Sequence, residues 1–103
     1  HTCLPAVYEN GKNIVINNGA AGMANIQGQT FGLITRIAKS SHEKAIYSEF
    51  RDGLYIELVK VDFDIEKFKL WFEKIWPDNT PASISYKNRI MNGTSLEIED
   101  IIV

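Results

Sequence analysis

Apolar side chains recur at alternate positions in several segments of residues 1–62, and this period of two is typical of β-strands. One such segment, residues 5–17, surrounds Asn10-Gly11, and another, residues 45–62, surrounds Asp52-Gly53. Both dipeptides favour the positive φ angles of a two-residue hairpin turn. We therefore predict two hairpins, with a further strand over residues 31–38 between them.

The Asn10-Gly11 turn also predicts how the residues of the first hairpin pair. With two residues in the turn, Glu9 lies opposite Lys12 and Val7 lies opposite Ile14. The first pair brings opposite charges together, which stabilises a cross-strand contact by roughly 0.2–1 kcal/mol. The second pair starts the apolar face of this hairpin.

The second hairpin carries apolar residues on both of its faces. Counting pairs from the turn assigns Phe50, Tyr55, Ile46, Val59 and Val61 to one face, and Leu54, Ile56, Tyr47, Leu58 and Ala45 to the other. A sheet with one wet face would alternate apolar and polar residues, so both faces are predicted to be covered. Because a chain of 103 residues has few elements to provide that cover, we expect part of it to come from sequence outside this chain or from another chain.

The apolar spacing changes to that of a helix after residue 63. The positions that follow the i, i+3, i+4, i+7 pattern are Ile65, Phe68, Phe72, Ile75 and Trp76. Asp64 is the predicted N-cap of this helix, and Pro77 ends it. A shorter helix is predicted from Pro81 to Met91, with Gly93 just past its end.

These elements predict an α+β fold, with antiparallel strands and hairpins followed by two carboxy-terminal helices. Residues 1–62 form the β-rich part, and residues 63–103 form the helical part, which ends in a strand or extended tail over residues 96–103. The whole chain, 1–103, has the size of a single domain or a fragment. Because it begins with His1 and has no features of a transit peptide, we expect it to be the carboxy-terminal piece of a longer protein.

Composition and charge narrow the classes of partner. With 45% hydrophobic and 23% charged residues, the chain has the composition of a globular domain. Its net charge of −2 and lack of a Lys/Arg block disfavour nucleic acid and anionic membrane surfaces. No apolar run approaches the roughly 18 residues needed to span a bilayer. Cys3, the single cysteine, allows no intramolecular disulfide, and we expect a cytoplasmic location, where thiols stay reduced.

Two short segments contain groups suited to ligand chemistry. His1 and Cys3 are two residues apart, so in an extended segment their side chains point the same way. Imidazole and thiolate are both ligands of transition metals. Asn18-Gly19-Ala20 begins a loop of small, uncharged residues over 18–30, where successive N–H groups can cradle an anion. Taken alone, each segment also has a simple structural explanation, as a buried thiol near a chain end and as a flexible turn.

Taken together, these segments resemble the carboxy-terminal end of the calcineurin-like metallophosphoesterases. The resemblance is carried by His1-Thr2-Cys3-Leu4-Pro5, by residues 15–23 and by residues 31–37. In that superfamily the last metal-binding motif, Gly-His-x-His, precedes a strand that leads to an Asn-rich, Gly-containing loop near the metals. The resemblance implies a piece of a four-layer β-sandwich. It also implies hydrolysis of a small phosphate ester by a hydroxide that two divalent metal ions activate.

The resemblance further implies roles for individual residues. His1 matches the first histidine of the motif, which binds one metal, and Cys3 stands where the second histidine normally binds the other. A thiolate there favours Zn or Fe over Mn or Mg, because it is a softer ligand than imidazole. Asn18, Gly19 and Ala20 are implied to line the phosphate end of the pocket. Because the other ligands of the family have no counterpart in this sequence, we expect the parent protein to be the enzyme and this chain alone to be inactive.

A non-catalytic α+β interaction or oligomerisation domain is the alternative interpretation. It is indicated by the aromatic helix face around Phe68 and Trp71 and by the apolar end Ile101-Ile102-Val103. Under this interpretation His1 and Cys3 are incidental. The expected partner is then a second copy of the chain or the missing amino-terminal part of the protein.

Overall fold

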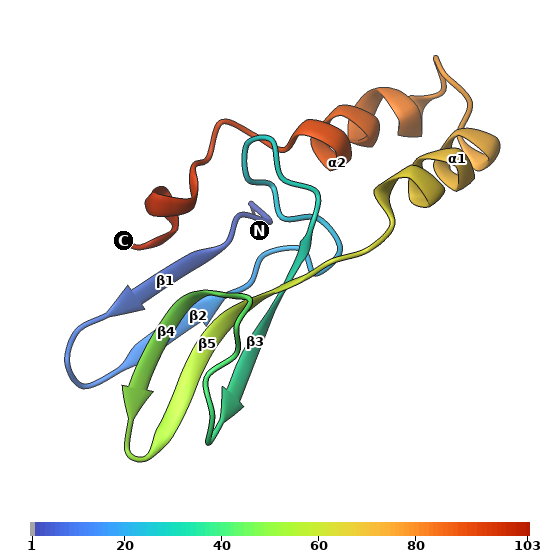
Figure 1. The fold of residues 1–103 in the computed structure, drawn as a ribbon. Coiled ribbons are helices and arrows are strands. Elements are labelled where there is room, and N and C mark those ends of the chain that lie inside the picture. The colour runs from blue at the N-terminus through green and yellow to red at the C-terminus, as the bar shows by residue number, and fades with distance from the viewer. Residues whose placement is uncertain (1) are drawn as a thin grey trace.

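The computed structural model describes residues 2–103 and has an α+β fold (Figure 1). Its five strands are β1 (Ala6–Glu9), β2 (Ile14–Asn17), β3 (Gly32–Ala38), β4 (Ala45–Arg51) and β5 (Leu54–Val61). They are followed by helix α1 (Ile65–Ile75), the π-helical turn η1 (Ser83–Lys87), helix α2 (Asn88–Asn92) and the 3₁₀ turn η2 (Ile98–Ile101). The strands form two antiparallel sheets, β1-β2 and β3-β5-β4. The predicted α+β class, with antiparallel strands followed by two carboxy-terminal helices, is therefore confirmed.

The first hairpin forms, but its pairing differs from the prediction by two residues. Val7 pairs with Ile16 rather than Ile14, because the connection consists of residues 10–13 instead of two residues. The carboxamide oxygen of Asn10 accepts hydrogen bonds from the backbone N–H groups of Lys12 and Asn13, at 3.1 and 2.9 Å. These bonds close a wider loop than the predicted turn. A shift of two keeps every side chain on its predicted face, because side chains alternate with a period of two.

The predicted charge pair of the first hairpin is replaced by a longer-range one. Glu9 lies opposite Ile14 and not opposite Lys12. Its carboxylate instead meets Arg51 at the end of β4, with 2.8 Å between Nη2 and Oε1. The ion pair joins the two sheets at their hairpin ends.

The second hairpin has the predicted two-residue turn. Asp52 and Gly53 have φ angles of 53° and 80°, and Arg51 pairs directly with Leu54. Further along, a β-bulge between Ala45 and Tyr47 changes the faces of the residues before it. Ala45 therefore shares the face of Val59, and Ile46 packs against the core beside Tyr47. Ala45 and Ile46 thus lie on the faces opposite to those predicted.

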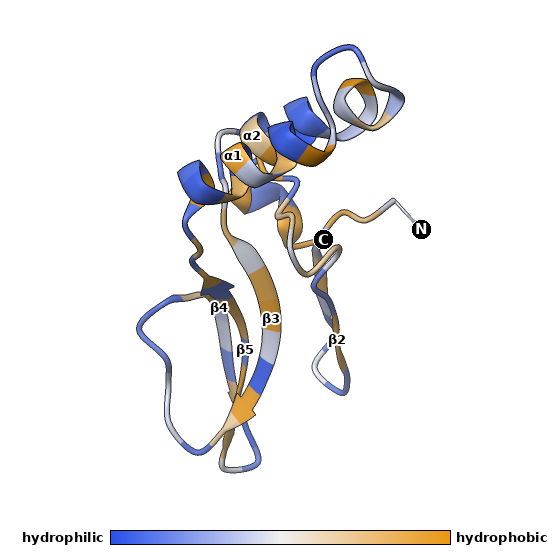
Figure 2. Cartoon of the chain, turned by 90° about the vertical axis from the view of Figure 1, so that its right-hand side faces the viewer, coloured by the Kyte–Doolittle hydropathy of each residue, from blue (hydrophilic) through white to orange (hydrophobic). Residues whose placement is uncertain are grey.

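The two sheets pack as layers around one core. Figure 2 shows β2 on one side and β3, β5 and β4 on the other, with the helices beyond one end of the strands. The fully or nearly fully buried side chains of this core are Val7, Ala24, Ile26, Phe31, Leu33, Leu58 and Ile101. Two of them, Ala24 and Ile26, lie in the 18–30 loop, where no strand or helix was predicted, and Ile101 lies in η2, within the strand or tail predicted over residues 96–103. The middle of this loop is therefore a buried part of the core.

The carboxy-terminal segment joins the core without forming a strand ladder. Leu96 makes a single parallel bridge with Ile26, and Ile102 makes one with Val7. Between them, η2 is closed by a capping box in which Glu97 and Asp100 exchange side-chain and backbone hydrogen bonds. The strand or tail expected over residues 96–103 is therefore a 3₁₀ turn between two bridges.

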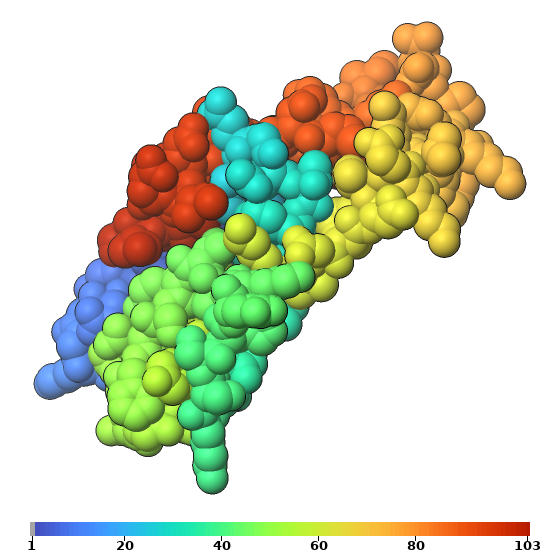
Figure 3. Space-filling view, in the orientation of Figure 1, coloured from blue at the N-terminus to red at the C-terminus, as the bar shows by residue number. Residues whose placement is uncertain are grey.

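The helices extend away from the sheets. Asp64 caps α1 as predicted, accepting a hydrogen bond from the backbone N–H of Lys67 at 3.0 Å. The second helical segment runs from residue 81 to Asn92 and contains η1 in its middle, which the sequence did not predict. In α1, only Phe72 is buried. Figure 3 shows the two helices projecting from the body formed by the strands and the carboxy-terminal segment. Residues 63–92 are called the helical arm below.

Candidate functional site

The segment before β1 lies against the loop that starts at Asn18. Cys3 is exposed and has a φ of 61°, and its carbonyl oxygen accepts a hydrogen bond from the backbone N–H of Ala20 at 3.4 Å. A Cβ atom at Gly19 would lie 2.6 Å from the same oxygen. Cys3 and the Gly19-Ala20 pair are therefore in direct contact. His1 lies outside the described residues.

Glycine is required at position 19 for two independent reasons. The φ of Gly19 is +67°, in the left-handed region, and any side chain would collide with the backbone of Cys3. The loop is also closed locally, because Asn17 Oδ1 accepts a hydrogen bond from the N–H of Gly19 at 2.8 Å. Asn18 Oδ1 lies 3.5 Å from the hydroxyl of Thr35 in β3. The loop is thus held against the segment before β1 and against β3. The N–H groups of Gly19 and Ala20, which the sequence suggested could cradle an anion, are both donated within the chain.

Asn25 connects the segment before β1 to the helical arm. Its side chain is fully buried, and its backbone has a φ of 58°. The amide nitrogen Nδ2 donates to the carbonyl of Cys3 at 2.8 Å, and Oδ1 accepts from Arg89 Nη2 at 3.2 Å. The backbone carbonyl of Asn25 accepts from the hydroxyl and the N–H of Thr94 at 2.5 and 3.3 Å. The position of the Cys3 peptide is therefore set by residues far away in the sequence.

The sequence analysis missed both Asn25 and Arg89. Asn25 lies between Ala24 and Ile26 in a loop without periodicity, and Arg89 is one of two cations in the predicted second helix. The left-handed backbone of Asn25 is typical of asparagine among non-glycine residues, but the sequence does not show that its side chain is buried. A cavity of about 430 Å³ lies beside this network, with Thr2, Leu4 and Arg89 among its lining residues.

The described residues do not by themselves form a metal centre. Among residues 2–103 there is no group of three or more His, Cys, Asp or Glu side chains placed to hold one ion. Protein metal sites of the zinc type use at least three protein ligands. Cys3 offers one donor in this region. A two-metal centre on this chain would therefore need further ligands from outside residues 2–103.

A second polar cluster surrounds Glu57, on the face of the β3-β5-β4 sheet opposite to the face that carries the core residue Leu58. The carboxylate is fully buried and accepts hydrogen bonds from Arg36 Nη1 at 2.8 Å, Ser41 Oγ at 3.0 Å, Ser48 Oγ at 3.0 Å and the backbone N–H of His42 at 3.1 Å. Burial raises the pKa of Glu57, but the hydrogen bonds from these donors outweigh it and hold the pKa below its usual value. With every donor directed at one carboxylate that has no access to solvent, this cluster is structural.

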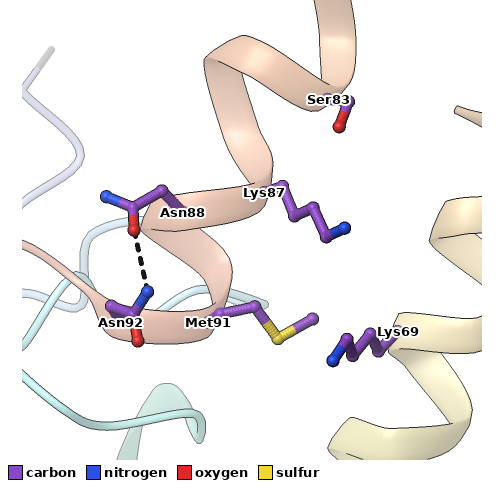
Figure 4. Close-up of a pocket in the computed structure, with 6 residues that line it drawn as sticks. All are labelled: Lys69, Ser83, Lys87, Asn88, Met91 and Asn92. Carbon is purple, nitrogen blue, oxygen red and sulfur yellow. Dashed lines mark hydrogen bonds between the residues drawn. The ribbon is translucent and has the colours of Figure 1, made fainter. Parts of the chain in front are cut away.

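A further cavity lies between the two helices of the arm (Figure 4). It measures about 360 Å³, and Lys69, Lys87 and Met91 extend into it. Lys87 Nζ already forms ion pairs with Glu73 at 2.9 Å and with Asp78 at 2.8 Å. These two carboxylates neutralise the ammonium group, so the cavity is a poor anion site.

Comparison with known proteins finds no family model, curated protein or solved structure that matches this chain. Within residues 2–103, no helix is long and apolar enough to cross a bilayer.

Proposed function

We propose that this chain is the carboxy-terminal part of a calcineurin-like metallophosphoesterase, an enzyme that hydrolyses a small phosphate ester. In the proposal, the two sheets belong to the four-layer β-sandwich of that superfamily, and the parent protein is cytoplasmic. The chain contributes His1 and Cys3 to the metal end of the site and Asn18, Gly19 and Ala20 to the phosphate end.

The contact between Cys3 and the Gly19-Ala20 pair is the observation that carries the proposal. These two segments are separated along the chain by the whole first hairpin and were singled out separately for metal and phosphate chemistry. The steric exclusion of any side chain at position 19 and the Ala20 N–H bond to Cys3 keep them together. A single active site that binds a metal and a phosphate requires such proximity.

The residues of this chain have limited tasks in the proposed reaction. Bound metal ions would supply an activated hydroxide and neutralise charge on the phosphate. Cys3, exposed and fixed through its peptide by Asn25, would hold one ion, and the softness of its thiolate favours Zn or Fe. Since residues 2–103 contain no further set of ligands, the chain alone is expected to be inactive.

The two histidines of the chain provide a matched test in the full-length protein. The His1→Ala variant is expected to lose bound metal and to release phosphate from glycerol phosphate more slowly, by a factor on the order of 100 or more. Even substitution of a residue that only hydrogen-bonds to a metal ligand lowers metal affinity or activity roughly 10–100-fold. His42→Ala is the control, because His42 lies in the β3–β4 connection and contacts Glu57 through its backbone. Metal content is measured by elemental analysis and the rate by phosphate release.

Two results would contradict the proposal. The first is an unchanged metal content and rate in His1→Ala, which would remove His1 from the site. The second is metal-dependent hydrolysis by the 103-residue chain on its own, which would show that the ligands lie within it.

The exposed apolar residues of the arm favour a second candidate, a non-catalytic interaction domain. Leu70 and Trp71 of α1 and Ile84 of η1 expose 69%, 54% and 72% of their surface. In that case the full-length protein would hydrolyse no phosphate ester, and both histidine variants would behave as the wild type does.

A further inference from the structure

Gly22 differs from the other glycines of the chain. Five of the seven have a φ in the left-handed region, namely Gly11, Gly19, Gly28, Gly53 and Gly93. Gly32 has no room for a side chain, because a Cβ atom would lie 2.3 Å from the carbonyl oxygen of Ala21. Gly22 has neither constraint, since its φ lies outside that region and no atom lies within 4 Å of its Cβ position. The backbone therefore does not require glycine there, and the effect of its missing side chain is to leave space open.

That open space is a groove between the loop and the start of α1. The groove has a volume of about 510 Å³, and the rings of Phe63, Phe68 and Trp71 line it opposite Gly22. Phe68 contacts both other rings, with centroids 6.0 Å from Phe63 and 5.7 Å from Trp71. A volume of this size with a mainly aromatic lining is typical of sites for small molecules.

The groove adjoins the proposed phosphate end of the site. Gly22 lies in a tight turn closed by a hydrogen bond from the N–H of Met23 to the carbonyl of Ala20, at 3.0 Å. The turn is anchored to β3 by a second bond, from the N–H of Leu33 to the carbonyl of Ala21, at 3.3 Å. Gly19 and Ala20, at the start of the turn, contact Cys3. Gly22 is three residues after Gly19, at most about 11 Å from it, and faces the aromatic rings.

The polar residues at the groove are Asp64 and Lys67, so one carboxylate and one ammonium group line it and their formal charges cancel. Asp64 uses its carboxylate to cap α1, through the N–H of Lys67. Within residues 2–103, no carboxylate lies within ion-pair distance of the Lys67 ammonium group. A flat aromatic wall is complementary to another aromatic ring, and the Lys67 ammonium group beside it can add a cation–π contact to that ring.

We infer that this groove, between Gly22 and Trp71, binds the aromatic alcohol portion of an aryl phosphate ester. The inference rests on the proposed function, because the adjoining loop must bind the phosphate group. The enzyme is then selective for aromatic esters over esters of small polar alcohols.

Two variants of the full-length protein test this selectivity. Gly22→Leu fills the groove at a position whose backbone accepts a side chain, and Trp71→Ala removes the ring of a residue that is already half exposed. Both are expected to raise KM for phenyl phosphate about 10-fold, a loss typical of removing one ring contact, and to change KM for glycerol phosphate less than two-fold. Leu70→Ala is the matched control, as Leu70 neighbours Trp71 in α1 and does not line the groove.

The possible outcomes separate the two proposals. If the wild type hydrolyses both esters and the variants affect them equally or not at all, the groove does not bind the aromatic portion, and the proposed function stands. If the wild type hydrolyses neither ester, both proposals are overturned. Binding of phenylphosphonate, followed by tryptophan fluorescence in a Trp76→Phe background, gives a readout independent of turnover. In the Trp76→Phe variant, the tryptophan fluorescence is expected to change as phenylphosphonate is titrated. In the double variant that also carries Gly22→Leu, the fluorescence is expected to stay constant.

Discussion

A single buried carboxylate, Glu57, determines how the β3–β4 connection lies on the sheet. Its oxygens accept hydrogen bonds from the guanidinium of Arg36, from two serine hydroxyls and from the backbone N–H of His42. Since the hydrogen bonds lower the pKa of Glu57 more than burial raises it, the group is ionised at neutral pH. Ionised Glu57 therefore stabilises the folded chain, and the connection stays closed over the sheet.

The lowered pKa of Glu57 predicts a loss of stability in acid. A group whose pKa is lower in the folded than in the unfolded state contributes stability above its unfolded value, about 4.3, and that contribution falls as the pH drops through the folded value. Glu57→Gln is expected to lower the free energy of unfolding at pH 7 by about 3 kcal/mol, because it removes the charge of the buried carboxylate and leaves the partly exposed Arg36 without its ion-pair partner. It should also flatten the decline in stability between about pH 5 and pH 3.

Urea unfolding at several pH values measures this effect. Glu43→Gln is the control, since Glu43 lies in the same connection but is exposed to solvent. An equal decline with pH in wild type and Glu57→Gln would show that Glu57 is not the source of the acid sensitivity.

The sequence singled out the residues of the candidate site but not the residues that support them. The two segments around Cys3 and Gly19 were singled out because their residue types suit metal and phosphate chemistry; the structure places them in contact, and their roles stay predictions. Asn25 and Glu57 were not recognised, because their partners are distant: Arg89 is 64 residues from Asn25, and Arg36 is 21 residues from Glu57. The role of a buried polar residue depends on which donors the fold brings to it, and no local pattern records that.

At the scale of elements, local signals predicted strands and helices well and pairing less well. Asp52-Gly53 gave the expected two-residue turn, whereas the carboxamide of Asn10 captured two backbone N–H groups and widened the first loop to residues 10–13. Asparagine supports both arrangements, by adopting positive φ or by closing a turn with its side chain. No local signal in the sequence marks the bulge at Ile46 or the π turn η1.

Helix α1 depends on its N-cap more than a well-buried helix would. It has 11 residues, fewer than an isolated helix needs for stability in water, and only Phe72 is buried. Asp64→Ala is expected to destabilise α1 by about 1 kcal/mol. Because α1 contributes little to the core, the loss should appear as faster hydrogen exchange within residues 65–75, with a small change in Tm.

Hydrogen exchange by mass spectrometry checks this, and β5 provides the internal reference. β5 is the central strand of its sheet, paired on both sides, so its amides exchange mainly through global unfolding. If Asp64→Ala accelerated exchange in β5 as much as in α1, the helix would be part of the cooperative core and this view of α1 would be wrong.

The whole molecule is longer than a compact domain of its size. Its extents are 50 × 23 × 18 Å and its radius of gyration is 15.4 Å, against about 13 Å for a compact chain of about 100 residues. The difference arises because the helical arm projects beyond the sheets (Figure 3). As a result, Leu70, Trp71 and Trp76 remain accessible on the arm while the sheets enclose the core.

The extended shape gives a final prediction, for the 103-residue chain in dilute solution. Small-angle X-ray scattering is expected to give a radius of gyration of at least 15.4 Å that does not change with concentration. A value of about 13 Å, that of a compact chain, would mean that the arm folds back to bury its apolar side chains against the sheets. If the forward scattering divided by protein concentration doubled as the concentration rose, the apparent mass would have doubled. The arm would then bury these side chains against a second copy, as the interaction-domain alternative requires. Leu70→Ala and Trp71→Ala remove apolar surface from the arm, so either variant should weaken such a dimer but leave the scattering of a monomer unchanged.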